Sequence, residues 1–181
     1  MPDTISSDTA LLENALLQLR AEDDLAGEGM RTVYRMMAKK MLRAAFTVTQ
    51  NTADAEDVLQ DSLLKLYQAR DTYRPTGHPQ AYVLTVVRHT ALDLVRNRQK
   101  TITEDLSAVE NTLEAPPDGS DGTAAVAELL APLSAEDRLL VILRLYEELP
   151  YAEIARILGL SVHAAQKRYQ RALAKLRTQF T

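Results

Sequence analysis

The stretch YAEIARILGLSVHAAQKRYQRAL, residues 151–173, has apolar residues at helical spacing on both sides of a Gly-Leu-Ser corner. Gly159 can adopt the left-handed backbone conformation that ends a helix, and Ser161 can cap the next one. The small side chain of Ala155 allows the two helices to cross closely, and Leu160 and Val162 are expected to fill the corner. This pattern predicts a helix-turn-helix, a motif whose second helix lies in the major groove of DNA.

The second helix of this motif is basic. From residue 161 onward the sequence holds five Lys or Arg residues and no Asp or Glu, and DNA phosphates favour cations that lack a neighbouring counter-charge. Gln side chains can also form two hydrogen bonds with adenine. Taken alone, the stretch fits a helical hairpin with a solvated basic face as well. The side chains expected to contact DNA are His163, Gln166, Lys167, Arg168, Gln170, Arg171 and Lys175.

The composition is that of a globular protein. The 181 residues are 46% hydrophobic and 25% charged, with a net charge of -4 and no Cys, so the chain can form a core, and any attraction to nucleic acid must come from a local cluster of cations. Neither a cationic signal segment nor an apolar run of roughly 20 residues is present. We therefore expect a cytoplasmic protein that does not insert into a membrane.

Helical periodicity dominates the chain outside residues 100–122, with a break at the Pro- and Gly-containing stretch DTYRPTGHP, residues 71–79, and no alternating pattern indicates a strand. Residues 100–122 are acidic and rich in turn formers, which is typical of a linker. The sequence therefore predicts an all-α fold with two small domains. We expect a helical domain over residues 1–99, a flexible acidic linker over 100–122 and the helix-turn-helix domain over 123–181.

Two consecutive helices of the first domain are expected to carry opposite charges. DAEDVLQDSLLKLYQ, residues 54–68, should begin at a cap formed by Asn51 or Thr52, with acids in its first turn that complement the helix dipole. AYVLTVVRHTALDLVRNRQK, residues 81–100, ends in several cations. The side chains of the first helix that are expected to face outward are Asp54, Asp57, Gln60, Asp61 and Lys65.

In this order and spacing, the segments resemble the extracytoplasmic-function (ECF) group of bacterial sigma factors, within the sigma-70 superfamily. DAEDVLQDSLLKLY is similar to the part of region 2 that docks on the clamp helices of the RNA polymerase beta-prime subunit. AYVLTVVRHTALDLVRNRQ is similar to the adjoining part, which melts and reads the minus-ten promoter element. LSAEDRLLVILRLYEELPYAEIARILGLSVHAAQKRYQRALAKLR, residues 133–177, resembles region 4, which binds the minus-thirty-five element.

The resemblance implies partners and functional residues. The partners would be core RNA polymerase, promoter DNA and an anti-sigma factor, and the acidic linker would occupy the cationic RNA path of the polymerase. The basic helix described above would bind the minus-thirty-five element. The polymerase-binding residues would be Asp54, Glu56, Asp57, Gln60, Asp61 and Lys65. The minus-ten DNA-binding residues would be Tyr73, Arg74, His78, Tyr82, Arg88, His89, Arg96 and Arg98.

Three positions depart from the family pattern. Tyr82-Val83 stands where the family usually has Trp-Leu, His89 stands in place of an Asn, and Ala165 stands in place of a Val. The first two lie near the pocket that takes a flipped promoter base. The promoter preference of this chain therefore does not follow from the resemblance.

Other functions are less consistent with the sequence. A stand-alone helix-turn-helix regulator is the alternative, and it would bind symmetric half-sites without polymerase. No Gly-rich phosphate loop or nucleophile motif is present, so we expect neither enzymatic activity nor a cofactor. His78, His89 and His163 are far apart in the sequence and lack the spacing of metal ligands, so no metal site is expected.

Overall fold

The computed structural model describes residues 6–21, 26–104 and 121–179, and every regular element within these ranges is a helix. The predicted all-α fold is therefore confirmed. No helix in the described ranges is both long and apolar enough to cross a membrane. The elements are α1 (Ser7–Gln18), the 3-10 turn η1 (Leu19–Ala21), α2 (Glu28–Thr49), α3 (Thr52–Gln68), α4 (Pro79–Glu104), α5 (Asp121–Leu130), α6 (Ala135–Leu145), α7 (Tyr151–Leu158) and α8 (Val162–Arg177).

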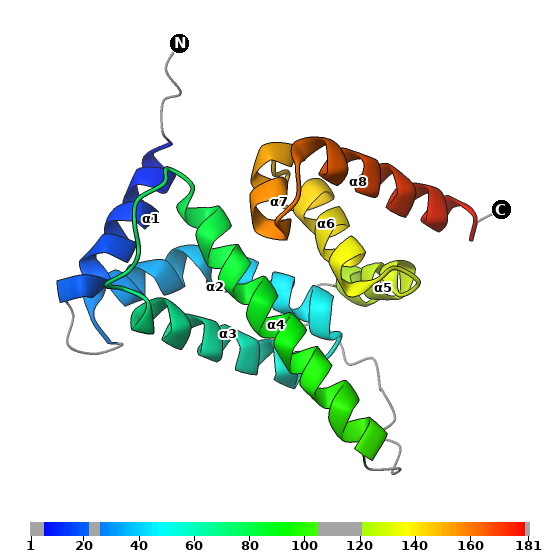
Figure 1. Cartoon of the computed structure of the whole chain (residues 1–181), viewed down its shortest axis with the longest axis horizontal. Helices are drawn as coiled ribbons and strands as arrows, with labels where there is room; N and C mark the ends of the chain where they lie inside the picture. The colour runs from blue at the N-terminus through cyan, green and yellow to red at the C-terminus, as the bar shows by residue number, and fades with distance from the viewer. Residues whose placement is uncertain (1–5, 22–25, 105–120, 180–181) are drawn as a thin grey trace.

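In the first helical group, α1, α3 and α4 pack around α2 (Figure 1). The buried face of α2 carries Val33, Met37, Met41 and Ala45, each of which is 2% exposed or less. These residues lie four apart, the spacing at which a helix buries one continuous stripe. The methionines of α2 thus belong to the core.

The beginning of α3 agrees with the sequence, whereas the end of α4 does not. The Asn51 side chain accepts a hydrogen bond from the backbone N–H of Asp54 at 2.9 Å, which satisfies one of the free donors at the start of α3. α4 continues to Glu104, beyond the predicted end of the first domain at residue 99, because no Pro or Gly interrupts residues 100–104. The predicted linker therefore overlaps α4 at its start and α5 at its end. Its residues 105–120 lie outside the described ranges.

α7 and α8 form the predicted helix-turn-helix corner. Gly159 ends α7 in the left-handed conformation, with a φ of 65°, and the Ser161 hydroxyl accepts a hydrogen bond from the backbone N–H of Ala164 at 3.1 Å. Ala155 is 5% exposed, in keeping with a close crossing of the two helices. The local chemistry of the corner therefore follows from its sequence.

One packing prediction at this corner is wrong. Val162 is 44% exposed, because it is the first residue of α8 and lies beside the exposed Ser161 and His163. Tyr169 is buried instead, and its ring meets the edge of Tyr151 with the two centroids 5.9 Å apart. The corner is therefore packed by Leu160, which is half-buried against the core, while Tyr169, about two turns along α8 from Val162, provides the buried aromatic side chain.

The two helical groups pack against each other, with α6 against α2 and α7 against α4 (Figure 1). Arg138 of α6 donates from Nε to the Thr47 carbonyl at 2.9 Å and from Nη2 to the Val48 carbonyl at 3.2 Å. Carbonyls at the end of a helix lack partners within it, and a cation there interacts favourably with the helix dipole. Arg43 of α2 also pairs with Glu147, just beyond α6. The sequence did not predict this interface.

Candidate nucleic-acid interface

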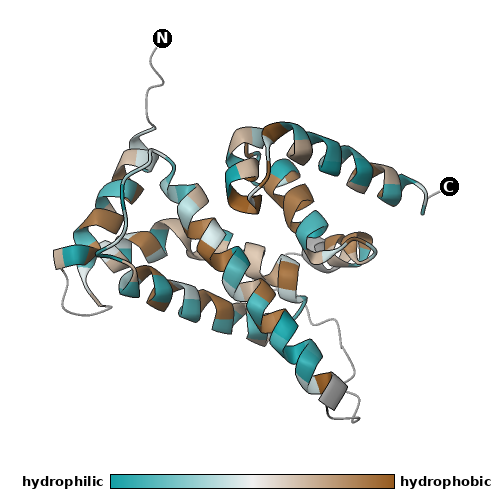
Figure 2. Ribbon diagram, viewed as in Figure 1, coloured by the Kyte–Doolittle hydropathy of each residue, from teal (hydrophilic) through white to brown (hydrophobic). Residues whose placement is uncertain are grey.

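The outer face of α8 is polar and cationic, and Figure 2 shows hydrophilic residues along most of this helix. Gln166, Lys167 and Gln170 are exposed, and their spacing places them on one side of α8. Among the described residues, no carboxylate lies within ion-pair distance of Lys167 or Arg171. A shallow depression on this face is lined by His163, Gln166, Lys167, Gln170 and Arg171.

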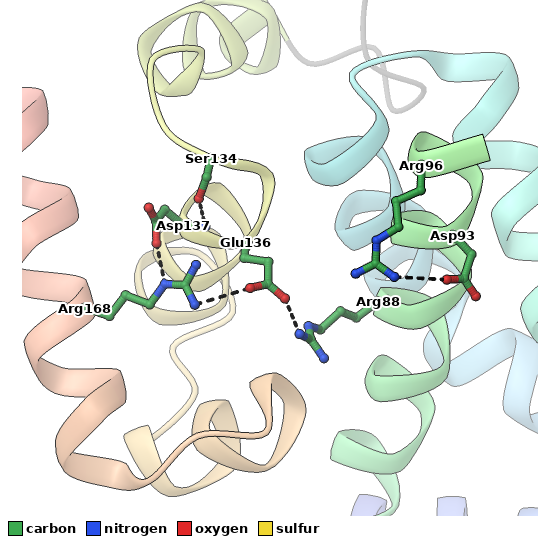
Figure 3. A network of polar contacts seen from close by, with 7 residues as sticks. All are labelled: Arg88, Asp93, Arg96, Ser134, Glu136, Asp137 and Arg168. Atoms are coloured by element: carbon green, nitrogen blue, oxygen red, sulfur yellow. Dashed lines mark hydrogen bonds and ion pairs between the residues drawn. The ribbon is translucent and has the colours of Figure 1, made fainter. Parts of the chain in front are cut away.

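Arg168 lies on the side of α8 that faces α6 (Figure 3). Its Nε donates to Asp137 Oδ1 at 2.5 Å, and its Nη1 donates to Glu136 Oε2 at 3.3 Å. Burial lowers the pKa of Arg168, but the hydrogen bond and charge of Asp137, followed by those of Glu136, outweigh burial and raise it. The basic helix has no acid in its own sequence, so α6 supplies the counter-charge from elsewhere in the chain.

Glu136 connects the two helical groups. Its second oxygen accepts a hydrogen bond from Arg88 of α4, so this carboxylate lies between two arginines that were predicted to bind DNA (Figure 3). Burial raises the pKa of Glu136, but the hydrogen bond and charge of Arg88, followed by those of Arg168, outweigh burial and lower it. Glu136 is therefore charged at neutral pH, and in this conformation both arginines are engaged within the chain.

The loop between α3 and α4 contains several of the predicted minus-ten residues. Tyr73 is only 5% exposed, and its ring centroid lies 4.7 Å from that of Tyr82, which is half-buried. Arg74 is exposed and donates to the carbonyl of Tyr73 at 3.0 Å. His78 pairs with Glu153 of α7. The structure therefore brings these residues together, with Tyr73 in the core rather than at the surface.

The remaining predicted minus-ten residues lie along α4. His89 is exposed, and Arg96 forms an exposed pair with Asp93 at 3.6 Å on the same helix (Figure 3). Exposed pairs of this kind contribute about 0.3–0.5 kcal/mol, so Asp93 holds Arg96 only weakly. Arg98, near the end of the helix, pairs with Asp54 of α3.

The polar face of α3 agrees with the prediction except at Asp54. Glu56, Asp57, Gln60 and Asp61 are exposed, whereas Asp54 is 2% exposed. The prediction that Asp54 faces outward is wrong because its carboxylate is turned toward α4, where it pairs with Arg98. Lys65 is exposed, and its Nζ donates to the Thr90 hydroxyl of α4 at 3.1 Å.

Three acids that hold predicted DNA-binding residues were not identified from the sequence. Glu136 and Asp137 follow the cap residue Ser134, and acids in a first helical turn are already explained by the helix dipole. Glu153 likewise lies in the first turn of α7. No local signal distinguishes an acid that complements a dipole from one that pairs with an arginine on a distant helix.

Comparison with known proteins accounts for this combination of helices. The sigma-70 region 2 family matches residues 33–101, and the sigma-70 region 4 family matches residues 123–176. RNA polymerase sigma factor SigV of Bacillus subtilis is 30% identical over 139 residues, which are 77% of this chain and 83% of SigV. The ECF RNA polymerase sigma factor SigL of Mycobacterium tuberculosis is 29% identical over 153 residues, which are 82% of this chain and 86% of SigL. The chain belongs to the ECF group of the sigma-70 family.

Two solved structures share the fold of this sigma factor. One is the sigma factor RpoE of Bartonella quintana in complex with the anti-sigma factor NepR, with a TM-score of 0.72, 20% identity and coverage of 84% of this chain and 96% of that one. The other is CnrH in complex with the cytosolic domain of CnrY, with a TM-score of 0.67, 23% identity and coverage of 96% of both chains. The protein is accordingly an RNA polymerase sigma factor that binds core enzyme, recognises promoter DNA and directs transcription initiation.

Proposed function

We propose that this sigma factor divides promoter recognition between its two helical groups. Residues 1–99 would bind core polymerase and the minus-ten element, and residues 123–181 would bind the minus-thirty-five element. The observation that carries this proposal is the outer face of α8, where the exposed side chains of a helix-turn-helix are polar or cationic. Residues 100–122 would join the two parts, and their acidity suits the cationic RNA path of the polymerase.

On α8, the assignment separates base reading from phosphate binding. Gln166 and Gln170 lie on the outer strip, and an amide in the major groove can form two hydrogen bonds with adenine. His163 and Lys167 share that strip. Arg171 and Lys175, further along the helix, are assigned to the phosphate backbone, together with Arg168 once it leaves its carboxylate partners.

On α3, the exposed acidic face is assigned to the clamp helices of the beta-prime subunit. Asp57, Gln60 and Asp61 follow one another at spacings of three and one, and Leu64, 40% exposed, continues the same side of the helix. A polar surface with one apolar side chain among its acids fits a cationic and partly apolar partner. Glu56 and Lys65 flank this surface, whereas Asp54 acts indirectly by holding Arg98.

The loop over residues 71–78 and the first turns of α4 are assigned to the minus-ten element of the promoter, where they would capture an unpaired base. Extracting a base from the stack costs a few kcal/mol, and stacking on an aromatic ring with backbone contacts offsets that cost. Tyr82 is the aromatic ring of this assignment. Arg74, His89 and Arg96 are exposed around it or along α4 and would bind the single strand.

The proposal requires a rearrangement of the described conformation. Arg88 and Arg168 share the carboxylate of Glu136, and His78 is paired with Glu153. Each of these three side chains must exchange a carboxylate of the second helical group for a DNA phosphate or base. The interface between α6, α7 and the first helical group would therefore open when the sigma factor binds polymerase and promoter.

An anti-sigma factor is the proposed regulatory partner, because both structural relatives were solved as complexes, one with the anti-sigma factor NepR and one with the cytosolic domain of CnrY. Such a partner would hold the two helical groups in an arrangement that cannot engage the promoter. We further propose that the protein has no catalytic centre of its own. It would act in the cytoplasm, where it would determine which promoters the polymerase recognises.

The test is promoter selection from a randomised DNA library, with the full-length chain in the presence and absence of core RNA polymerase. The proposal expects enrichment of two separated, asymmetric elements that depends on core enzyme. The alternative of a stand-alone regulator expects symmetric half-sites that are enriched equally well without core enzyme. The second result would contradict the proposed function.

A further inference from the structure

The loop over residues 71–78 is held by one carboxylate from the N-terminal helix. Glu13 of α1 accepts hydrogen bonds at the same oxygen, Oε1, from the backbone N–H groups of Thr76 and Gly77, both at 3.0 Å. The Tyr73 hydroxyl donates to this oxygen as well, at 3.3 Å. A carboxylate can accept several hydrogen bonds, and such bonds are stronger than those to a neutral acceptor.

The turn at Thr76 and Gly77 is held by these contacts with Glu13. Gly77 has a φ of 77°, and the space around the position of a Cβ is open, so packing does not fix it. Successive backbone N–H groups at such a turn form a concave site for an anion. In this structure the carboxylate of Glu13 is that anion, and it occupies the N–H groups of Thr76 and Gly77 that another anion would need.

The same helix holds the beginning of the loop. Arg20, in the 3-10 turn that follows α1, donates from Nε to the Arg70 carbonyl at 3.1 Å, and its guanidinium also donates to the Tyr73 carbonyl. Two side chains from η1 and α1 thus bind the loop near both of its ends. The conformation of the loop therefore depends on a helix that precedes it by about 50 residues.

Tyr73 connects Glu13 and the loop to Tyr82 of α4. Its ring is buried against the ring of Tyr82, with the centroids 4.7 Å apart and the planes tilted by 45°. Burial raises the pKa of the Tyr73 hydroxyl, and the neighbouring Glu13 raises it further, so the hydroxyl stays protonated and donates. A shift of Glu13 would consequently move the ring of Tyr82.

We propose that Glu13 is a positioning residue for minus-ten recognition. It sets the conformation of the loop over residues 71–78 and, through Tyr73, the orientation of the Tyr82 ring, and thereby controls how tightly and how selectively an unpaired promoter base is captured. This inference rests on the proposed assignment of that loop to the minus-ten element. It gives α1 a function in DNA recognition although α1 itself need not touch DNA.

The test uses full-length variants assembled with core RNA polymerase and a fork-junction DNA library whose single-stranded minus-ten positions are randomised. Glu13→Ala should weaken binding of the best selected sequence by about tenfold, as expected for the loss of charge-assisted hydrogen bonds, and should reduce base discrimination at the captured position. Glu13→Gln should restore most of both properties, because its amide oxygen still accepts from Thr76 and Gly77. Core-enzyme affinity should not change in either variant. Asn14→Ala, an exposed neighbour on α1, is the matched control and should behave as wild type.

Tyr82→Ala separates this inference from the assignment on which it rests. If Tyr82→Ala weakens capture and Glu13→Ala leaves affinity and discrimination unchanged, the positioning role is wrong and the loop assignment stands. If neither variant changes capture, both are wrong. If Glu13→Ala and Glu13→Gln lose thermal stability and core binding to the same extent as DNA binding, Glu13 has a purely structural role, which would also overturn the inference.

Discussion

α3 and α6 begin alike but differ in what their acids contact. Each is preceded by a cap residue, Asn51 or Ser134, whose side chain accepts a hydrogen bond from a backbone N–H three residues on. Each has acids in or next to its first turn. On α3, Asp57 and Asp61 are exposed, and among the described residues they pair with no cation. On α6, the first-turn acids Glu136 and Asp137 bind arginines of α4 and α8. The first-turn acid of α3, Asp54, is likewise held within the chain, by Arg98.

This difference shows that a local pattern fixes where negative charge lies on a helix but not what neutralises it. Asp57 and Asp61, beyond the first turn of α3, have no cation partner among the described residues, and we assign them to polymerase. The α6 acids, Glu136 and Asp137, form ion pairs within the chain, and their partners are two arginines that are assigned to DNA, Arg88 and Arg168. Substitutions at the two helices should therefore have opposite effects on function.

The largest expected effect is at α3. Replacing Asp57 and Asp61 together by Lys should abolish binding to core RNA polymerase, because the reversed charges repel the cations that the acids are assigned to meet. Helix content and melting temperature should stay close to those of wild type, since both side chains are exposed. Co-elution on size-exclusion chromatography with core enzyme measures the effect. Continued co-elution of the reversed variant would show that this face is not the docking surface.

The next effect concerns the two glutamines on the outer face of α8. Gln166→Ala should change which upstream sequence is preferred, at a cost of roughly 1–3 kcal/mol on the best sequence. Gln170→Ala should act similarly. A promoter-library selection with holoenzyme measures this change in preference.

Lys175→Ala is the matched variant for the phosphate role, and Arg168→Ala should resemble it. Each should weaken binding to all duplexes alike and reduce the slope of log affinity against log salt by about one. The assignment of the two sides of α8 would be reversed if the Gln variants lost affinity uniformly and a cation variant changed the sequence preference.

A smaller and opposite effect is expected at α6. Glu136→Gln with Asp137→Asn removes the charges that hold Arg168 and Arg88, so the sigma factor without polymerase should bind minus-thirty-five duplex more tightly, by about 1 kcal/mol or fivefold. Fluorescence anisotropy with labelled duplex measures the gain. Glu128→Gln on α5, a carboxylate outside the network, is the control. Unchanged or weaker binding by the double variant would contradict the competition between these acids and DNA.

The smallest effect is that of pH on the same network. The pKa of Glu136 is lower in the folded chain than its ordinary value of 4.5, so its contribution to the interface is fully present above that value and is lost as the pH falls through the lowered pKa. Labels at Asn97→Cys and Ala174→Cys, in a chain without native Cys, would report the separation of α4 and α8 by energy transfer. Separation on acidification should be reduced in Glu136→Gln. An equal response in that variant would assign the effect to other carboxylates.

Several features of the fold could be predicted because they depend on neighbours a few positions apart. Periodicity identified the helices, and the caps at Asn51 and Ser161 and the left-handed Gly159 marked their ends. The order of the polar helix, the basic helix and the helix-turn-helix was enough to identify the family. The exposed faces of α3 and α8 followed from the same periodicity, except at Asp54 and Arg168, which contact other helices of the chain.

What the sequence alone determined, then, is the set of helices, the ends marked by a cap residue or a glycine, and most of the charge on each outer face, since helix hydrogen bonds and same-face spacing span only three or four residues. The tertiary structure decided which charges meet. Arg98 pairs with Asp54, which is 44 positions away in the sequence, and Arg88 pairs with Glu136, which is 48 positions away. An ion pair requires two side chains within about 4 Å, and that proximity arises only when helices distant in sequence pack together. For the same reason the burial of Tyr73 and the hold of Glu13 on its loop, 60 or more positions away, became visible only in the folded chain.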